Sequence, residues 1–457
     1  MIRLYNTLSN NVEDFEPIEA GKVSMYHCGP TVYDFIHIGN LRAFYLADIL
    51  RRTFEYEGYK VKQVMNITDV GQLSSDADEG EDKMTKGLKR EGKPVTIEAM
   101  KELANFYTEK FKEDITKLNI LTPTELPKAS ENIVEDIELI QTLETKGFTY
   151  KTADGVYFDV SKSNDYGQLG GINSDDKNLA RVEANSEKRN QKDFALWKFN
   201  NTLGYPSPWG QGFPGWHIEC SAMSKKYLGE HFDIHTGGID LAPIHHNNEI
   251  AQSENACGHK TVNYWIHNEF VIMGEDKMSK SLGNFITIRT IEEKGFSPLA
   301  YRYFLLSSHY KTQTNFTWEA LEASQNAYRK LKEYFSTLPT GGSVNNDYKN
   351  EFIEKIENNL NTPEALAVVW KLIKDDIIAP ADKCSTLLDF DKVLGLNLLN
   401  NEFEIKNIPE DVEKLLIDRE MARSAKNWSK ADLLREEIKS KGFEVKDGEN
   451  GQILSKI

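Results

Sequence analysis

The chain of 457 residues is poor in cysteine, in long apolar runs and in positive charge. Its cysteines, Cys28, Cys220, Cys257 and Cys384, are scattered without a pairing rhythm, which argues against a disulfide framework and favours metal binding or burial. No segment approaches the roughly 18 consecutive apolar residues of a membrane-spanning helix, and the first residues lack the apolar core of a signal peptide. We therefore expect a soluble, cytoplasmic protein without membrane contact.

Acidic residues outnumber basic ones by 71 to 55, which gives a formal net charge of −16. A nucleic-acid-binding protein usually carries a basic surface, so this balance taken alone argues against one. A local basic face is still compatible with the composition, and it predicts selective, salt-sensitive contact rather than promiscuous binding. The length is too great for one hydrophobic core and predicts two to four domains.

The first part of the chain alternates between strand and helix patterns. Val23 to Cys28 and Val61 to Ile67 read as strands, and apolar residues recur at helical spacing from Leu41 to Phe54. Gly58 is a natural end for that helix. A strand, a helix and a second strand in this order predict an α/β fold with a doubly wound, Rossmann-like parallel sheet.

Composition and pattern divide the rest of the chain. We expect the sheet domain at residues 1–125 and 205–290, a turn-rich insertion at 126–204, a connecting region at 291–320, a helical bundle at 321–400 and a small terminal unit at 401–457. A helix is predicted over Glu98 to Leu118. In the terminal unit, Asp447-Gly448 and Asn450-Gly451 predict a hairpin, and Ser429 with Asp432 resembles a helix capping box.

Two polar segments predict a phosphate site. The first, from His37 to Asn40, lies between the first strand and the first long helix, where free N–H groups and the helix dipole favour an anion. Gly39 lets a nucleotide approach closely, and His37 and Asn40 can donate hydrogen bonds to phosphate oxygens. The second is a lysine loop formed by Lys277, Met278, Ser279, Lys280 and Ser281. Two lysines three residues apart suit a mobile clamp on a triphosphate, although each segment alone is also compatible with a structural turn or a solvated loop.

Four residues of metal-binding type are dispersed along the sequence: Cys28, Cys220, His245 and Glu249. The last two are four residues apart on a helix predicted to run from Pro243 to about Gly258, so they share one face. Two thiolates, an imidazole and a carboxylate are acceptable ligands for tetrahedral zinc. The chain has no Cys-x-x-Cys pair, so the spacing alone leaves open two buried cysteines and an exposed pair on a helix.

Together these segments resemble the cysteinyl-tRNA synthetase family of class I aminoacyl-tRNA synthetases. The resemblance covers nearly the whole chain and rests on both phosphate segments, the histidine pair at 245–246 and residues 28–34, 66–69, 216–223 and 303–310. The chain departs from the family pattern at two positions of the proposed active site, and its end at 451–454 lacks the tryptophan of many relatives. Asn40 replaces the family's second histidine, and Ile244 separates Pro243 from the histidine pair, which makes His246 the fallback metal ligand.

The resemblance implies an enzyme that activates L-cysteine with ATP and magnesium, releases pyrophosphate, and transfers cysteine to the 3′-terminal ribose of tRNA(Cys). It implies a monomer with one zinc per chain, held by Cys28, Cys220, His245 and Glu249. Because zinc prefers a soft thiolate to a hydroxyl, it would select the substrate thiolate without an editing domain. The sheet domain would be catalytic, residues 291–320 would contact the tRNA stem, and residues 401–457 would bind the anticodon.

The resemblance also assigns individual roles. The catalytic residues would be His37, Asn40, Lys277 and Lys280. ATP would contact Pro30, Thr31, His37, Gly39, Asn40, Gly237, Gly238, Asp240, Lys277, Met278, Ser279, Lys280 and Ser281. Cysteine would contact Gly29, Thr31, Thr68, Trp216 and His235. The anticodon loop would meet charge and an aromatic ring from Arg419, Arg423, Lys426, Trp428, Lys430 and Arg435.

Three other functions remain to be weighed. A ligase that joins cysteine to an amino sugar, as mycothiol-pathway relatives do, lacks an anticodon module, whereas this chain has a terminal unit. A catalytically silent tRNA-binding paralogue would not need the lysine loop and all four metal-ligand types. A methionyl enzyme is disfavoured because no Cys-x-x-Cys knuckle is present.

Overall fold

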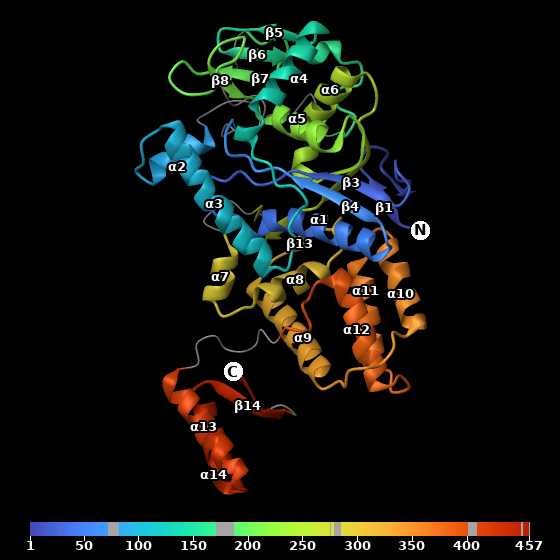
Figure 1. The fold of residues 1–457 in the computed structure, drawn as a ribbon, viewed down its shortest axis with the longest axis vertical. Coiled ribbons are helices and arrows are strands. Elements are labelled where there is room, and N and C mark those ends of the chain that lie inside the picture. The colour runs from blue at the N-terminus through green and yellow to red at the C-terminus, as the bar shows by residue number, and fades with distance from the viewer. Residues whose placement is uncertain are drawn as a thin grey trace.

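The computed structural model describes residues 1–71, 82–170, 187–274, 276–277, 285–400, 409–448 and 451–456 (Figure 1). No helix among these residues is long and apolar enough to cross a membrane.

A parallel four-stranded sheet lies at the centre, with the strand order β10-β9-β3-β4. The strands are β3 (Lys22–His27), β4 (Lys60–Met65), β9 (Phe232–Gly238) and β10 (Val262–Asn268). Helix α1 (Ile38–Tyr56) joins β3 to β4, and its apolar residues are buried against the sheet. Figure 1 shows α1 on one side of the sheet, with α5 (Trp216–Leu228) and α6 (Asn247–Cys257) on the other. The prediction of a doubly wound parallel sheet is confirmed.

The segment between the two halves of the sheet adds helices and an antiparallel sheet. The helices are α2 (Lys83–Arg90), α3 (Ile97–Lys117) and α4 (Ile133–Thr145), with short 3₁₀ turns η1 (Ala129–Glu131) and η2 (Val160–Lys162). The sheet has the order β5-β6-β7-β8 and comprises β5 (Thr149–Lys151), β6 (Gly155–Phe158), β7 (Phe194–Phe199) and β8 (Gly212–Pro214). Strand β8 lies after residue 204, where the sequence predicted the insertion to end.

The helix expected from Pro243 to about Gly258 is divided in two. Residues Ile239–Leu241 form a 3₁₀ turn, η3, and Ala242–His246 form a π-helical turn, η4, which continues directly into α6. A π turn adds a residue to the helical turn and is frequent at functional sites. Gly258 ends α6 in the left-handed conformation (φ 87°), as the sequence predicted.

Short strands and further helices complete the described part of the chain up to residue 400. They are β1 (Arg3–Asn6), β2 (Asn11–Asp14), β11 (Val271–Met273), β12 (Asp276–Lys277), β13 (Thr314–Asn315), α7 (Ile288–Glu293), α8 (Pro298–Leu306), α9 (Trp318–Ser336), α10 (Asn346–Glu357), α11 (Thr362–Lys374) and α12 (Pro380–Leu394). A buried carboxylate, Asp48 on α1, lies 2.6 Å from Arg302 on α8 and 2.9 Å from Arg52. Arg302 also donates to the carbonyl oxygen of Leu394 at 2.7 Å. Its guanidinium therefore connects α8 to α1 by an ion pair and to α12 by a hydrogen bond.

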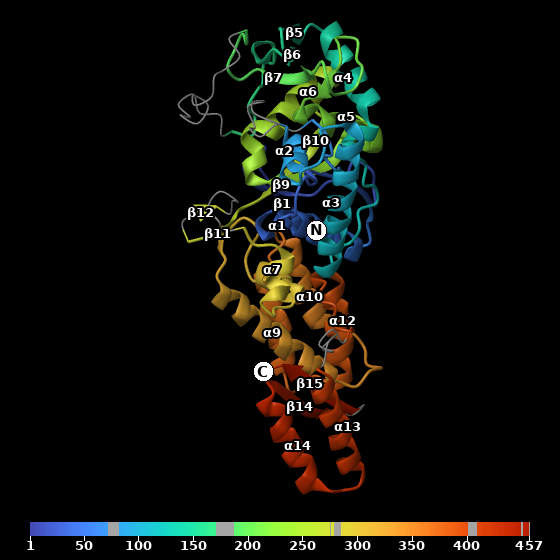
Figure 2. The same ribbon diagram turned by 90° about the vertical axis from the view of Figure 1, so that its left-hand side faces the viewer.

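The C-terminal unit is formed by α13 (Glu410–Ser424), α14 (Trp428–Ser440), β14 (Phe443–Gly448) and β15 (Gly451–Lys456), at the end of the molecule farthest from the antiparallel sheet (Figure 2). It has its own small apolar core of Val412, Ile438, Phe443 and Val445. Strands β14 and β15 pair antiparallel, which confirms the predicted hairpin. The predicted capping box at Ser429 is wrong: Asn427 caps α14 by accepting from the backbone N–H of Lys430 at 3.2 Å.

Candidate active site and metal centre

A buried cluster of metal-binding side chains lies beside the carboxyl ends of the central strands. Cys28 directly follows β3, Cys220 lies on α5, His245 on the π turn η4 and Glu249 on the first turn of α6. One donor atom from each lies within 4.8 Å of the others. The Sγ atoms of Cys28 and Cys220 are 3.9 Å apart, and His245 Nε2 is 2.9 Å from Glu249 Oε1. The structure thus brings together the four residues that the sequence singled out.

Burial and mutual contact perturb the pKa values of this cluster. The hydrogen bond from Cys28 lowers the pKa of Cys220 to about 6, while burial raises the pKa of Cys28 well above its usual range. Burial would raise the pKa of Glu249, but His235 and His245 lower it to about 2. Burial likewise opposes protonation of His245, yet Glu249 and Cys220 raise its pKa to about 10. The raised pKa values of Cys28 and His245 favour their protonated forms, and a bound metal would have to displace those protons.

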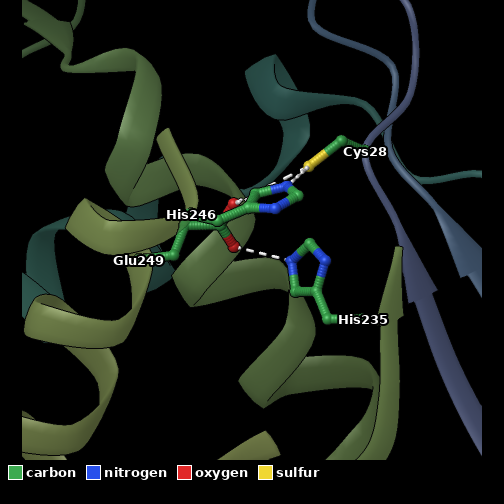
Figure 3. Close-up of side chains that lie close together, drawn as sticks. All are labelled: Cys28, His235, His246 and Glu249. Carbon is green, nitrogen blue, oxygen red and sulfur yellow. Dashed lines mark hydrogen bonds and ion pairs between the residues drawn. The ribbon is translucent and has the colours of Figure 1, made fainter. Parts of the chain in front are cut away.

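A second combination of ligands overlaps the first. Cys28, His235, His246 and Glu249 also have donor atoms within 4.8 Å of one another (Figure 3). His246 Nε2 lies 3.3 Å from the sulfur of Cys28, and His235 Nε2 lies 2.9 Å from Glu249 Oε2. The fallback ligand His246 is therefore within reach of the same centre.

Hydrogen bonds to the outer ring nitrogens distinguish the two combinations. A histidine ligand normally donates its other ring N–H to a partner, which fixes the ring. His245 has such a contact, because its Nδ1 lies 2.9 Å from Nδ1 of His217. His235 Nδ1 is buried and has no hydrogen-bond partner among the described residues. Binding through Nε2 of His235 would therefore bury an unsatisfied N–H, which favours the set with Cys220 and His245.

Two histidines that sequence reasoning did not single out support this centre. The Nδ1 atom of His217 lies within hydrogen-bond distance of Nδ1 of His245. The Nε2 atom of His267, on β10, lies 2.7 Å from Nδ1 of His246. The other ring nitrogen of His267 contacts Thr7 Oγ1 at 2.8 Å. His217 is adjacent to Trp216 and within one helical turn of Cys220, a signal that could have identified it. His267 is brought in only by the pairing of β9 with β10.

Residues 29–31, which follow β3, lie next to residues 66–68, which follow β4. Thr31 and Thr68 form a parallel bridge, and Thr68 N donates to the carbonyl oxygen of Pro30 at 3.0 Å. Gly29 N donates to Asn66 Oδ1 at 2.8 Å. A Cβ at Gly29 would overlap the carbonyl oxygen of Asn66 and lie 2.8 Å from its carbon, so only glycine fits. Asn66 lies in the 66–69 segment that carries the resemblance, but the sequence did not predict that it positions Gly29.

Aromatic and imidazole rings cover the metal centre from two sides. Trp216, at the start of α5, stacks on the ring of His245 with centroids 4.2 Å apart. His235 stacks on Trp265 at 4.4 Å and is buried. Trp216 is partly exposed, whereas His235 is enclosed by protein and bonded to Glu249. These positions suit Trp216 as a pocket wall and give His235 a supporting contact with Glu249, a candidate metal ligand.

The His37 segment and the segment after β9, both predicted to contact ATP, also lie at this end of the sheet. His37 caps α1: its Nδ1 accepts from the backbone N–H of Asn40 at 3.3 Å, so the ring proton is on Nε2. Gly39 is partly exposed and Asn40 exposed at the first turn of α1. Gly237, at the end of β9, is packed so closely that a Cβ would lie 2.7 Å from Cε1 of His246, and Gly238 with exposed Asp240 follows it.

Most of the predicted lysine loop falls outside the described residues. Met278, Ser279, Lys280 and Ser281 lie outside the described residues, and only the backbone of Lys277, in β12, is described. The chain after the loop lies against the start of α1: Ile38 N donates to the carbonyl oxygen of Ile286 at 2.8 Å, and the rings of His37 and Phe285 are 5.4 Å apart. Phe285 and Ile286, four and five residues after Ser281, therefore lie beside the His37 segment.

The basic residues of the C-terminal unit do not share one environment. Arg419 is buried and donates to Gln452 within the unit, so it does not belong to an exposed basic face. Trp428 is 57% exposed, and the guanidinium of Arg423 lies 5.7 Å from its ring centroid. An exposed ring beside a cation is available for stacking.

Comparison with known proteins agrees with this geometry. Residues 14–326 match the family described as tRNA synthetases class I (C) catalytic domain, and residues 406–453 match the cysteinyl-tRNA ligase anticodon binding domain. Cysteine–tRNA ligase 1 of Burkholderia lata is 46% identical over 99% of this chain and 96% of its own length. The cysteine–tRNA ligase of Treponema denticola is 44% identical over 98% of each chain.

A solved structure shows the same fold. The methionyl-tRNA synthetase of Mycobacterium tuberculosis, in complex with methionyl-adenylate, superposes with a TM-score of 0.56 at 15% identity and covers 82% of this chain and 90% of its own. Both family matches and the near full-length identities then decide the assignment. The chain belongs to the cysteine–tRNA ligase family of class I aminoacyl-tRNA synthetases.

Proposed function

We propose that this chain activates L-cysteine with ATP and transfers it to tRNA(Cys) for protein synthesis. The observation that carries the proposal is the buried Cys28, Cys220, His245 and Glu249 cluster, which lies at the same edge of the parallel sheet as the His37 segment. Ligands in open parallel sheets bind at the carboxyl ends of the strands, which is where both features lie.

The buried cluster is proposed to hold one zinc ion through Cys28, Cys220, His245 and Glu249. The donor set fits, because two sulfurs, one nitrogen and one carboxylate oxygen converge in a buried site. Bound there, zinc would supply a soft Lewis acid that prefers a thiolate to the hydroxyl of serine. Shape alone separates such small side chains poorly, so the chemistry of the centre provides specificity.

The residues around the cluster are proposed to form the cysteine pocket. Gly29, Thr31 and Thr68 lie on the paired segments after β3 and β4, and Trp216 lies over His245. Backbone groups and a hydroxyl on two rigid segments can orient the amino and carboxylate groups of a small substrate. His235 acts through its contact with Glu249 Oε2 at 2.9 Å.

The ATP phosphates are proposed to meet His37, Asn40, Lys277 and Lys280. Nε2 of His37 is the donor of that ring, because Nδ1 accepts from Asn40 N. Pro30, Thr31, Gly39, Gly237, Gly238, Asp240 and the rest of the lysine loop, Met278, Ser279 and Ser281, complete the proposed ATP contacts. Asn40 keeps a donor where the family's second histidine would stand.

The reaction is proposed to proceed in two displacements, with ATP bound as its magnesium complex. A carboxylate oxygen of cysteine attacks the α-phosphorus of ATP, the P–O bond to the β-phosphate breaks, and pyrophosphate leaves with that electron pair. A ribose hydroxyl at the 3′ end of the tRNA then attacks the cysteinyl carbonyl, and AMP leaves. The protein contributes mainly positioning and charge stabilisation.

The parts of the chain are proposed to divide the work as follows: residues 1–125 and 205–290 for catalysis, 126–204 as the connective insertion, 291–320 for the tRNA stem, 321–400 as the helical bundle and 401–457 for the anticodon. The enzyme is proposed to act as a cytoplasmic monomer. Light scattering should show a single species at the mass of one chain without tRNA(Cys), and one chain plus one tRNA when tRNA(Cys) is added.

ATP–pyrophosphate exchange with each amino acid in turn, before and after zinc chelation, tests the activation step. Exchange with cysteine alone, abolished by chelation and restored by zinc, is expected. Transfer to tRNA(Cys) tests the second step and separates this function from an amino-sugar ligase. A folded, zinc-loaded chain that shows no exchange with cysteine would overturn the proposal and favour a silent tRNA-binding protein.

A further inference from the structure

A second group of metal-binding side chains lies on the surface, outside the active site. Glu230 follows α5, Cys257 is the last residue of α6, and His259 follows Gly258. One donor atom from each lies within 4.8 Å of the others. Glu249, in the buried centre, is on the first turn of the same helix, eight residues before Cys257. At 1.5 Å per residue this separates the two groups by roughly 12 Å along α6.

The backbone at the end of α6 brings the three residues together. Gly258 takes the left-handed conformation, with φ 87°, which ends the helix and turns the chain. The turn brings His259 Nε2 to 3.7 Å from Glu230 Oε2. His259 Nδ1 lies 3.0 Å from the carbonyl oxygen of Lys260. A carbonyl only accepts, so the proton is on Nδ1 and Nε2 is the basic nitrogen that a metal binds.

The group is open to solvent. The side chains of His259 and Glu230 are 48% and 52% exposed, and Cys257 is partly buried. A cation can therefore reach the three donors without local unfolding, and water can complete its coordination. Glu230 is already paired with Lys225, whose Nζ lies 2.8 Å from Oε1. A metal at this position must compete with that ammonium group.

We propose that Glu230, Cys257 and His259 form a second metal site, for a zinc-class divalent cation. A thiolate with an imidazole selects borderline-soft metals such as zinc or cobalt over magnesium and calcium, which prefer oxygen ligands. The site has three protein ligands and is exposed, so it binds more weakly than the four-ligand buried centre. It does not depend on the proposed aminoacylation function.

A cobalt titration of the full chain tests the site. The buried centre is first filled with one equivalent of zinc, and Co²⁺ is then added. A second equivalent should bind and produce the absorption of thiolate-coordinated Co²⁺. Cys257→Ser should abolish that absorption. His259→Ala should weaken Co²⁺ binding by at least about tenfold, because even the loss of a residue that only supports a metal ligand costs about tenfold in affinity. Cys384→Ser, which removes the other cysteine outside the buried centre, is the matched control and should leave the signal unchanged.

A further variant gives an effect of opposite sign. Lys225→Met removes the competing ammonium and should tighten Co²⁺ binding, a result not expected if the metal binds elsewhere. ATP–pyrophosphate exchange should remain the same in Cys257→Ser, which shows that the buried centre is intact. No second equivalent, a second equivalent without thiolate absorption, or a signal that persists in Cys257→Ser would each overturn the proposal.

Discussion

The choice between the two overlapping ligand sets of the buried centre can be decided by mutation. Cys220→Ser and His245→Asn remove residues found only in the set with two thiols, whereas His235→Asn and His246→Asn remove residues found only in the other. Both sets share Cys28 and Glu249, so variants of those residues cannot discriminate between them.

The expected magnitudes follow from the contacts. Removing a residue that only supports a metal ligand weakens metal binding by up to about 100-fold, or about 2.7 kcal/mol. Removing a ligand that binds zinc directly should weaken zinc binding by more than this. His235 contributes one 2.9 Å contact to Glu249 Oε2, and its other ring nitrogen is unpaired among the described residues. Its loss should therefore cost about tenfold, or about 1.4 kcal/mol.

Competition with a chromophoric chelator measures the zinc dissociation constant of each variant. The series is best made in a Cys257→Ser background, so that the proposed surface site does not contribute. Near-ultraviolet circular dichroism controls for folding. If Cys220→Ser retains tight zinc binding while His235→Asn or His246→Asn loses it, the argument from the unpaired Nδ1 of His235 is refuted, and the other set holds the metal.

Three further changes have defined outcomes. Gly29→Ala places a Cβ onto the backbone of Asn66 and should lower the rate of cysteine activation about 100-fold, the effect of roughly a 1 Å displacement, in a pyrophosphate-exchange assay. Asp48→Asn leaves the buried guanidinium of Arg302 without its carboxylate partner and should lower the free energy of unfolding by about 3 to 5 kcal/mol in urea titrations. Burial raises the pKa of Asp114 to about 7, so its ionisation destabilises the folded chain as pH rises from about 4 through 7. Asp114→Asn should therefore stabilise the chain by about 1 to 2 kcal/mol at pH 8 and have little effect near pH 4, as urea titrations at both values would show.

Each of these changes has a contradicting result. Full activity in Gly29→Ala would mean that the segments after β3 and β4 can separate without cost. An unchanged urea midpoint in Asp48→Asn would mean that water replaces the carboxylate. A stability gain in Asp114→Asn that is equal at both pH values would exclude ionisation as its cause.

The sequence alone determined the parallel sheet, the helix from about residue 98 and the terminal hairpin, and it singled out Cys28, Cys220, His245 and Glu249, which the structure brings together. Local pattern carries the first three, because strand, helix and turn preferences act over a few residues. These four residues could be singled out because thiol, imidazole and carboxylate groups are chemically distinctive and resemble those of a family. The cap of α14 was misplaced by two residues, since Asn427 and Ser429 are both acceptable caps and only the position of the turn decides between them.

Only the tertiary structure decided which groups support that centre. His217 contacts His245 because α5 packs beside η4, and His267 contacts His246 because β10 pairs with β9. The surface group of Glu230, Cys257 and His259 likewise depends on the left-handed turn at Gly258 and on the end of α5 lying beside it. These contacts depend on how helices pack and strands pair. The periodicity of a sequence predicts single helices and strands but not the distance between them, so it could not predict these contacts.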